Sequence, residues 1–355
     1  MPAKQSIRTP ANSNHYEPTR KKSVSRLRTG GLGYGYAPPP PPPPPTSPLV
    51  ALGSAPGSCG FSSDGGITWT GANSGLINGY CVAWNGSIWV AVGDSLANTI
   101  ATSPDRINWT GRGNTIFTQT GYGVAWNGLL WVAVGQGTNT IATSPDGMTW
   151  TASINGNSIF SACQGVAWNG SKWVAGGYGA NKIAYSTDGM NWTASTSGNS
   201  MFGSGGNVFG VAWNGSLWVA GGYGANTIAT STDGITWHPS SNGHLIFTNS
   251  CYGAAWNGSK WVAVGYGTNS IATSPDGMNW TGSTNGNSIF TNQNISGVAW
   301  AGNKWVVAGN GGPTYCIATS TDGMNWTGST TSLFNNYAHG VASEVSNYPP
   351  YTSPY

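Results

Sequence analysis

The chain has 355 residues, of which only 6% are charged, and its formal net charge is +3. A typical soluble domain has about a quarter of its residues charged, so this composition favours neutral polar partners for most of the chain. Five cysteines are scattered without a CxxC or Cys/His spacing, which predicts reduced thiols rather than a disulfide framework or a metal centre. They are Cys59, Cys81, Cys163, Cys251 and Cys316.

The first 37 residues are polar, basic and rich in glycine, with too few apolar residues to bury a core. They hold seven of the 13 Lys and Arg residues and one acid, Glu17. We therefore predict a disordered basic arm over residues 1–37 that contacts a polyanion, such as nucleic acid or an acidic protein face. The alternative is a tail that keeps a weakly charged body soluble. The candidate contact residues are Arg20, Lys21, Lys22, Arg26 and Arg28.

An unbroken run of prolines, Pro38–Pro45, follows the arm. Such a run forms a stiff polyproline II rod of about 3.1 Å per residue, or about 25 Å in all. We predict a spacer over residues 38–48 that holds the arm away from the next domain. A ligand for SH3-type or WW-type domains is the alternative.

One short segment then recurs seven times, and its third copy reads Ser144-Pro145-Asp146-Gly147-Met148-Thr149-Trp150. An aspartate in a tight turn accepts hydrogen bonds from backbone N–H groups two or three residues on, and the following glycine tolerates positive φ. The tryptophan offers an apolar face for packing between sheets. We call these segments the aspartate turns and predict a structural role for their carboxylates. The aspartates are Asp64, Asp105, Asp146, Asp188, Asp233, Asp276 and Asp322.

The spacing of the aspartate turns indicates the fold. Successive aspartates are 41, 41, 42, 45, 43 and 46 residues apart. A period of about 40–50 residues with strand-like content is typical of a β-propeller, which has one four-stranded antiparallel blade per repeat. In the fourth repeat we place the strands at 165–168, 172–177, 182–186 and 190–193, with an Asn-Gly dipeptide predicting a two-residue hairpin with positive φ at both central positions.

The two ends of the repeat array complement each other. The first repeat begins at Leu49–Gly53 and lacks its inner strand, whereas Gly340–Ser343 supplies one at the far end of the array. We therefore predict an all-β fold, a seven-bladed propeller over residues 49–345. Pairing of these two segments closes it and hides the edges that an open sheet would expose. A C-terminal tail over residues 346–355 follows.

The segment Ser62-Ser63-Asp64-Gly65-Gly66-Ile67-Thr68-Trp69 resembles the Asp-box, Ser-x-Asp-x-Gly-x-Thr-Trp, of sialidase-like (BNR) propellers. The other six copies lack one residue between Asp and Trp, and Arg106 replaces the glycine in the second copy. The resemblance covers roughly residues 49–345 and implies that the aspartates are structural. Near-identical arrays of this kind also resemble those of viral particle and tail-fibre proteins.

Enzyme chemistry is not expected. A sialidase, as the resemblance implies, needs three arginines for the substrate carboxylate, but after residue 50 only Arg106 and Arg112 occur. Outside the aspartate turns the only acids of the body are Asp94 and Glu344, and we expect these two not to meet, so a glycosidase carboxylate pair is not predicted. We expect no catalytic residues, no metal and no cofactor.

Binding is expected on the face that carries the loops between second and third strands and the links between blades. The Asn-Gly and aspartate turns lie together on the other face, where the repeats are nearly uniform. Strings ending at Phe117, Phe160, Phe202, Phe247 and Phe290 are predicted to fill the space between blades. The candidate ligand-binding residues are Tyr178, Asn181, Tyr223, Asn226, Tyr266 and Asn269.

Three functions remain open on the sequence. The first is a non-enzymatic structural or attachment propeller of a virion, with a rigid head on a basic, proline-spaced arm. The second is a glycan-binding lectin, and the third is an intracellular interaction scaffold. The partner would be a protein in an assembly or a surface glycan. The chain has no long apolar run and no signal-peptide core, so we expect a location in the virion or the host cytoplasm.

Overall fold

The computed structural model describes residues 47–54, 58–290, 294–310, 315–330, 333–334 and 337–344. All of them belong to one compact unit, residues 44–355. The predicted arm, its candidate contact residues, the proline run and the C-terminal tail lie outside the described residues.

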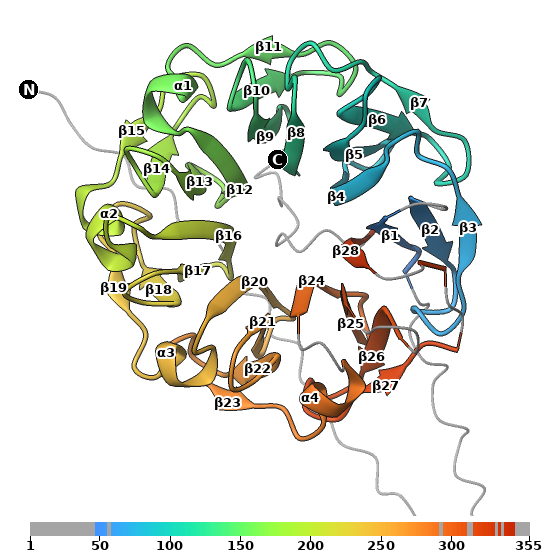
Figure 1. Cartoon of the computed structure of the whole chain (residues 1–355), viewed down its shortest axis with the longest axis vertical. Coiled ribbons are helices and arrows are strands. Elements are labelled where there is room, and N and C mark those ends of the chain that lie inside the picture. The colour runs from blue at the N-terminus through green and yellow to red at the C-terminus, as the bar shows by residue number, and fades with distance from the viewer. Residues whose placement is uncertain are drawn as a thin grey trace, which may run out of the picture. The chain divides into compact units, whose positions relative to one another are not determined.

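The described residues form seven four-stranded antiparallel sheets that stand in a ring (Figure 1). We number these blades by chain order, beginning with the one that joins both ends. Blade 1 contains β28 Ala338–Ser343, β1 Leu49–Gly53, β2 Cys59–Ser62 and β3 Thr70–Ala72. Blade 2 contains β4 Asn78–Trp84, β5 Trp89–Asp94, β6 Ile100–Ser103 and β7 Thr110–Gly111. Blade 3 contains β8 Thr120–Trp126, β9 Trp131–Gln136, β10 Ile141–Ser144 and β11 Thr151–Ala152. Blade 4 contains β12 Ala162–Trp168, β13 Trp173–Tyr178, β14 Ile183–Ser186 and β15 Thr193–Ala194. Blade 5 contains β16 Asn207–Trp213, β17 Trp218–Tyr223, β18 Ile228–Ser231 and β19 His238–Pro239. Blade 6 contains β20 Ser250–Trp256, β21 Trp261–Tyr266, β22 Ile271–Ser274 and β23 Thr281–Gly282. Blade 7 contains β24 Asn294–Trp300, β25 Trp305–Asn310, β26 Ile317–Ser320 and β27 Thr327–Gly328.

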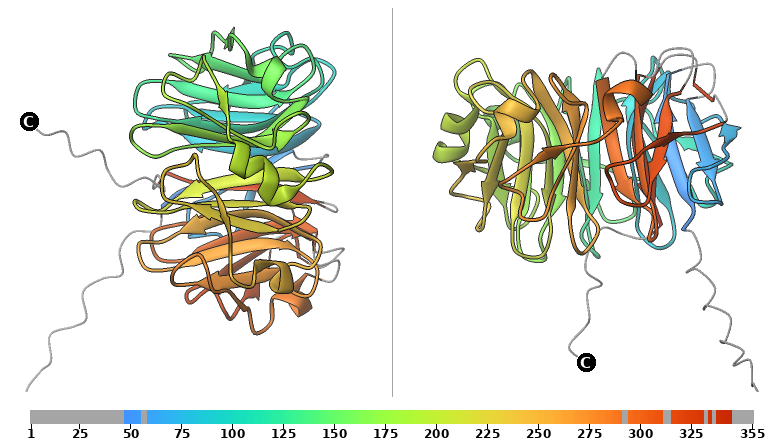
Figure 2. Two further views of the ribbon diagram at one scale, coloured as in Figure 1. Left: turned by 90° about the vertical axis from the view of Figure 1, so that its left-hand side faces the viewer. Right: turned by 90° about the horizontal axis from the view of Figure 1, so that it is seen from below.

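The predicted closure is confirmed. β28 pairs with β1 in an antiparallel register that runs from Leu49 opposite Ser343 to Gly53 opposite Ala338. β1 therefore has a partner on both sides, since it also pairs with β2. The inner strands β28, β4, β8, β12, β16, β20 and β24 surround the centre of the ring, and the blades extend outward from them (Figures 1 and 2).

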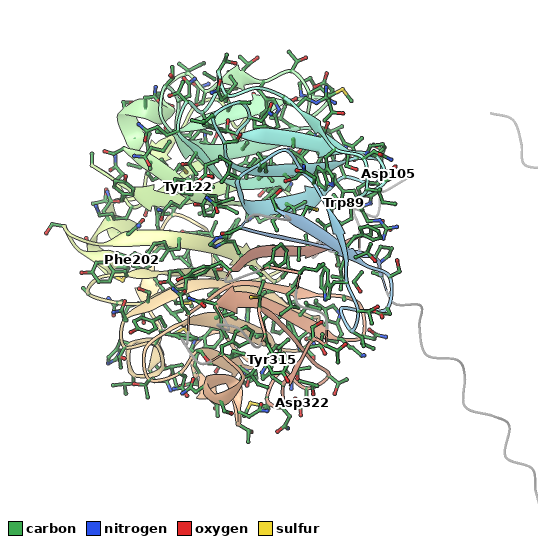
Figure 3. All side chains as sticks on the ribbon, turned by 45° about the vertical axis from the view of Figure 1, so that its right-hand side comes forward. Trp89, Asp105, Tyr122, Phe202, Tyr315 and Asp322 are labelled. Atoms are coloured by element: carbon green, nitrogen blue, oxygen red, sulfur yellow. The ribbon has the colours of Figure 1, made fainter. Side chains whose placement is uncertain are left out.

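Both faces of every blade are packed, which explains the apolar second strands. In β5, Val90 and Val92 pack against Trp131 of blade 3, whereas Trp89 and Ala91 on the opposite face pack against Leu52 of blade 1. A strand that is buried on both faces reads as a continuous apolar run instead of alternating. Figure 3 shows Trp89 among the packed strands and Asp105 at the edge of the molecule.

Each aspartate turn is held by the hydrogen bonds that the sequence predicts. Asp146 Oδ1 accepts from the backbone N–H of Met148 and of Thr149, both at 2.8 Å, and from Ser144 Oγ at 2.9 Å. The N–H of Thr149, then that of Met148, lowers the pKa of Asp146 below its ordinary value. Gly147 has φ 75°, and its carbonyl accepts from Trp150 Nε1 at 3.0 Å.

The Asn-Gly hairpin differs from the prediction. Trp126 pairs with Trp131, which leaves a four-residue loop, and only Gly128 in it has positive φ. The side chain of Asn127 holds the loop instead, because its Oδ1 accepts hydrogen bonds from the N–H of Leu129 at 2.9 Å and from the N–H of Leu130 at 2.6 Å. An asparagine whose side chain accepts hydrogen bonds from the backbone of its own turn stabilises that turn. Asn127 therefore does not need a positive φ.

Where the links between blades are described, they contain four short helices that were not expected from the sequence. Each ends at or next to one of the link phenylalanines, and Phe160, Phe202 and their equivalents are at most 2% exposed. The predicted filling of the space between blades is therefore confirmed. The helices are α1 Gly156–Ile159, α2 Thr196–Phe202, α3 Gly243–Ile246 and α4 Gly286–Ile289.

Candidate binding surface

One residue in each inner strand is excluded from the regular pairing. In blade 4, Cys163 pairs with Gly177 and Gly165 with Gly176, so Gln164 has no opposite residue and forms a β-bulge. The same shift occurs in the other inner strands, including β28, where it falls between Ala338 and Gly340. The seven bulge residues are Tyr80, Tyr122, Gln164, Phe209, Tyr252, Ser296 and His339.

The bulge residues meet their neighbours across the blades. Tyr80 lies with its ring centroid 5.7 Å from Tyr122 and 4.9 Å from His339, and Phe209 lies 5.0 Å from Tyr252. All seven side chains are half-buried. They therefore line the inner wall of the ring and remain accessible to a partner.

A second set of side chains stands beside the bulge residues, at the last position of the second strands. Tyr80 Oη donates to Asp94 Oδ2 at 3.1 Å, and Tyr122 Oη donates to Gln136 Oε1 at 3.2 Å. Gln136 Nε2 in turn donates to Tyr178 Oη at 3.1 Å, so hydrogen bonds join blades 3 and 4, and the ring contact between Tyr80 and Tyr122 connects blade 2 to them. We call the bulge residues and this second set together the channel mouth. The second set is Asp94, Gln136, Tyr178, Tyr223, Tyr266 and Asn310.

The titratable side chains of the channel mouth are mostly uncharged at neutral pH. Burial, and then the neighbouring charge of Asp94, raises the pKa of Tyr80, so this phenol keeps its proton at neutral pH. Burial lowers the pKa of His339, and the charge of Asp94 partly opposes that effect. The ring of His339 also stacks on Tyr337 at 5.6 Å and 9°. Neutral rings and amides therefore dominate, with Asp94 as the acid of this surface.

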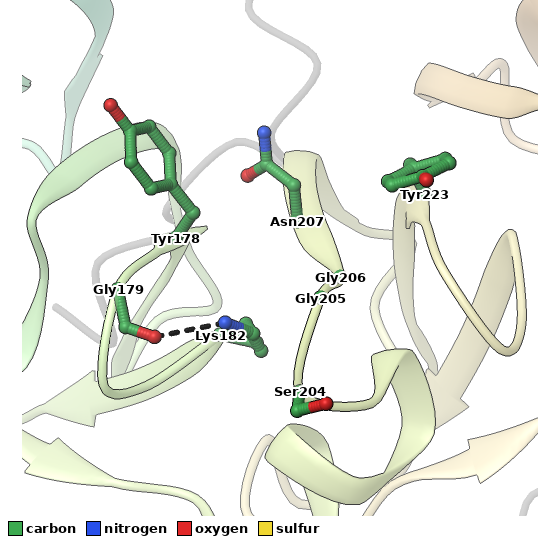
Figure 4. A pocket seen from close by; sticks show the side chains of 8 residues that line it. All are labelled: Tyr178, Gly179, Lys182, Ser204, Gly205, Gly206, Asn207 and Tyr223. Atoms are coloured by element: carbon green, nitrogen blue, oxygen red, sulfur yellow. Dashed lines mark hydrogen bonds between the residues drawn. The ribbon is translucent and has the colours of Figure 1, made fainter.

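Pockets open between neighbouring blades beside the channel mouth. The larger, of about 510 Å³, lies between blades 4 and 5 (Figure 4). Tyr178 and Tyr223 stand at its two sides, with Lys182 and Asn207 between them. A second pocket, of about 300 Å³, lies between blades 2 and 3 and includes Asp94.

The structure separates the six predicted ligand-binding residues into two groups. Tyr223 and Tyr266 are 49% and 41% exposed, and Tyr178 is half-buried at the channel mouth. The asparagines instead hold the links in place: Nδ2 of Asn181 donates to Ile159 O at 3.0 Å, and Asn226 donates to Met201 O at 2.7 Å. Asn269 makes the same bond to Ile246 O at 3.3 Å. Their binding role stays a prediction.

Sequence reasoning missed the bulge residues, although the sequence contains a signal for them. The motif Gly-Val-Ala-Trp is nearly uniform between repeats, but the residue before it changes from tyrosine to glutamine, phenylalanine, serine and histidine. In blade 4, close packing requires the glycine of this motif. A Cβ on Gly165 would lie 2.7 Å from the carbonyl oxygen of Phe209 in the next blade.

The remaining reactive groups are not gathered into a site in the described part of the chain. Asp94 lies near His339 at the start of β28, whereas Glu344 follows the end of that strand and lies 3.9 Å from Arg106 Nε. The two acids are therefore apart, as predicted. Cys59, Cys81, Cys163 and Cys251 are free thiols, and burial raises the pKa of Cys251 to about 12. Among the described residues, no three His, Cys, Asp or Glu side chains cluster as metal ligands.

The described residues thus form a seven-bladed β-propeller with a polar aromatic surface at the channel mouth. No family model and no curated protein sequence matches the chain. Solved structures that share its fold include the following three. A functionally unknown protein from Desulfotomaculum acetoxidans DSM 771 is 12% identical, with a TM-score of 0.57 over 84% of this chain and 99% of that one. The computationally designed Ika8 protein is 11% identical, with a TM-score of 0.53 over 83% and 90%. YCF48 bound to D1 peptide is 13% identical, with a TM-score of 0.51 over 74% and 91%.

These likenesses concern the fold alone, because the identities are low. Within the described residues, no helix is both long enough and apolar enough to cross a membrane.

Proposed function

We propose that this protein is a non-enzymatic attachment propeller that binds its partner at the channel mouth. The supporting observation is the contrast between two sets of equivalent positions in one chain. Positions that the fold requires, such as the aspartate turns, are nearly the same in all repeats. The bulge positions hold Tyr, Gln, Phe, Ser and His. Packing of the blades does not require different residues at these positions. Proteins often bind their partners through variable, accessible segments that a rigid scaffold holds in place.

We further propose that the head belongs to a virion-associated component. The order of a basic arm, a proline run and a rigid head suits a molecule that is anchored at one end and presents the other. In this proposal the partner of the head is a protein in an assembly or a surface glycan, and the arm contacts a polyanion. Neutralising Arg20, Lys21 and Lys22 should then flatten the salt dependence of binding to nucleic acid.

A glycan-binding role is the second candidate, and the pocket between blades 4 and 5 favours it. Tyr178 and Tyr223 offer amphipathic rings, and the amide of Asn207 offers polar atoms. Pockets of this composition bind small polar ligands by apolar contact and a few placed hydrogen bonds.

The test uses substitutions that the chain itself already tolerates at equivalent positions. Tyr252→Gln borrows the residue type of position 164, and Phe209→Ser borrows that of position 296. Together with Tyr178→Ala, Tyr223→Ala and Tyr266→Ala, they should weaken binding to purified virions or to a printed glycan array and leave the melting temperature unchanged.

The matched control lies on the opposite face. Leu129→Ser replaces an 83% exposed side chain by the serine of the other Asn-Gly loops and should leave binding intact. Loss of binding in the Leu129 variant but not in the channel-mouth variants would refute the proposed surface. Absence of the chain from purified virions by mass spectrometry would refute the virion assignment.

A further inference from the structure

One lysine stands where the other blades have small residues. Lys182 directly precedes the third strand of blade 4, and it is only 5% exposed. A threonine in this position can tie the link in place: in blade 2, Thr99 Oγ1 donates to Phe117 O at 2.9 Å. The fold therefore does not call for a lysine here. The equivalent residues are Ser58, Thr99, Thr140, Thr227, Ser270 and Cys316.

The ammonium group of Lys182 has an incomplete set of partners. Its Nζ donates to the carbonyl oxygen of Gly179 at 2.9 Å, which uses one of its three protons. Among the described residues, the one ion pair within 4.0 Å joins Arg106 and Glu344, so no carboxylate neutralises Lys182. A buried charge without a counter-charge is costly, and an anion that entered the pocket would offset that cost.

The same pocket contains a buried acceptor that lacks a donor. Asn207 Oδ1 has no hydrogen-bond partner and is shielded from solvent. Figure 4 shows Asn207 between Tyr178 and Tyr223, with the Lys182 side chain directed toward the carbonyl of Gly179. The lining between them is Ser204, Gly205 and Gly206, which leaves space for a ligand.

We propose that the pocket between blades 4 and 5 binds an acidic sugar residue. The carboxylate would neutralise Lys182, a sugar hydroxyl would form a hydrogen bond with the side-chain amide of Asn207, and the C–H face of the ring would contact the tyrosines. An acidic sugar provides an anion, a hydroxyl donor and an apolar face within one ring, and the volume of about 510 Å³ accommodates such a ring. This inference rests on the proposed binding function and names the ligand class of one part of the same face.

The chain contains an internal contrast to this pocket. The equivalent pocket between blades 2 and 3 places Asp94 where blade 4 has Tyr178, and Thr99 occupies the position of Lys182. Its charge is negative, so it repels carboxylates. Acidic sugars should therefore bind once per chain, between blades 4 and 5.

The experiment titrates sodium D-glucuronate into the full chain and measures affinity by ligand-observed NMR, with D-glucose as the neutral match. Lys182→Thr, which uses the residue of the neighbouring blades, and Lys182→Gln, which keeps most of the stem, should each weaken glucuronate binding at least tenfold. The matched control is Lys260→Leu, which removes one positive charge from the opposite face and installs the residue type of position 217. It should bind as the unmodified chain does.

Three results would overturn the inference. The first is that the folded chain does not bind glucuronate at millimolar concentration, and the second is that the Lys182 variants bind glucuronate as tightly as the unmodified chain. The third is that N-acetyl-L-aspartate binds as tightly as glucuronate, which would indicate an acidic peptide as the ligand. A different result would contradict the proposed function without affecting the acidic-sugar pocket. If the bulge variants Tyr252→Gln and Phe209→Ser, which lie outside the pocket, still bind virions and glycans while glucuronate binding depends on Lys182, the general surface is wrong and the pocket stands.

Discussion

At the scale of single residues, one carboxylate organises each aspartate turn. Asp146 accepts hydrogen bonds from two backbone N–H groups and from the hydroxyl of Ser144. We expect Asp146→Ala to lower the free energy of unfolding by about 1–3 kcal/mol, because donors lose their partner. Urea unfolding measures this change. A variant that keeps its stability but loses binding would show that the turn is a functional site.

Arg106 is the one residue other than glycine with positive φ among those described, at 71°. Its side chain lies 5.8 Å over the ring of Phe61 and 3.9 Å from Glu344, both in or next to blade 1. Arg106→Ala and Arg106→Gly both lose these contacts, but only alanine keeps the backbone strain. We therefore expect the glycine variant to be more stable than the alanine variant by about 1 kcal/mol. Equal stabilities in a thermal melt would contradict the strain at this position.

At the scale of elements, some neighbouring inner strands approach so closely that a side chain is excluded after the bulge, as at Gly165. On Gly165, a Cβ would lie 2.7 Å from Phe209 O and 2.9 Å from the Cα of Gly210, and both are backbone atoms that cannot rotate away. We expect Gly165→Ala to destabilise the protein by about 1–3 kcal/mol.

The chain supplies a control for this prediction in the equivalent strand of blade 6. A Cβ on Gly253 would meet nothing within 4 Å. Gly253→Ala should therefore be nearly neutral in the same chemical denaturation experiment. Similar losses in both variants would mean that the glycines act through backbone conformation rather than through the close approach of neighbouring blades.

At the scale of the whole molecule, stability depends on closure by β28. This strand covers β1, whose five residues are all buried. Deleting residues 338–355 should expose the edge of β1, with a large loss of melting temperature or aggregation in size-exclusion chromatography. Deleting only residues 346–355 keeps β28 and should preserve the fold. If the longer deletion melts like the full chain, closure contributes little.

The sequence by itself determined the architecture, because each local pattern repeats and agrees with the others. The period of the aspartate turns predicts the number of blades, and the incomplete first repeat together with residues 340–343 predicts the closure. The hydrogen bonds of Asp146 and the burial of Phe160 also follow from local residue types. Such features depend on neighbours that are close in sequence or on the repeat itself.

The candidate binding surface, by contrast, was decided by the tertiary structure. Tyr80 and His339 are distant in sequence and meet only because β28 returns to blade 1. The role of Asn181 as a tie to a link helix depends on where that helix forms. The exposure of Tyr223 and the burial of Lys182 are set by the packing of one blade on the next. A repeat motif specifies what each blade is, whereas a site shared between blades exists only once the ring has closed.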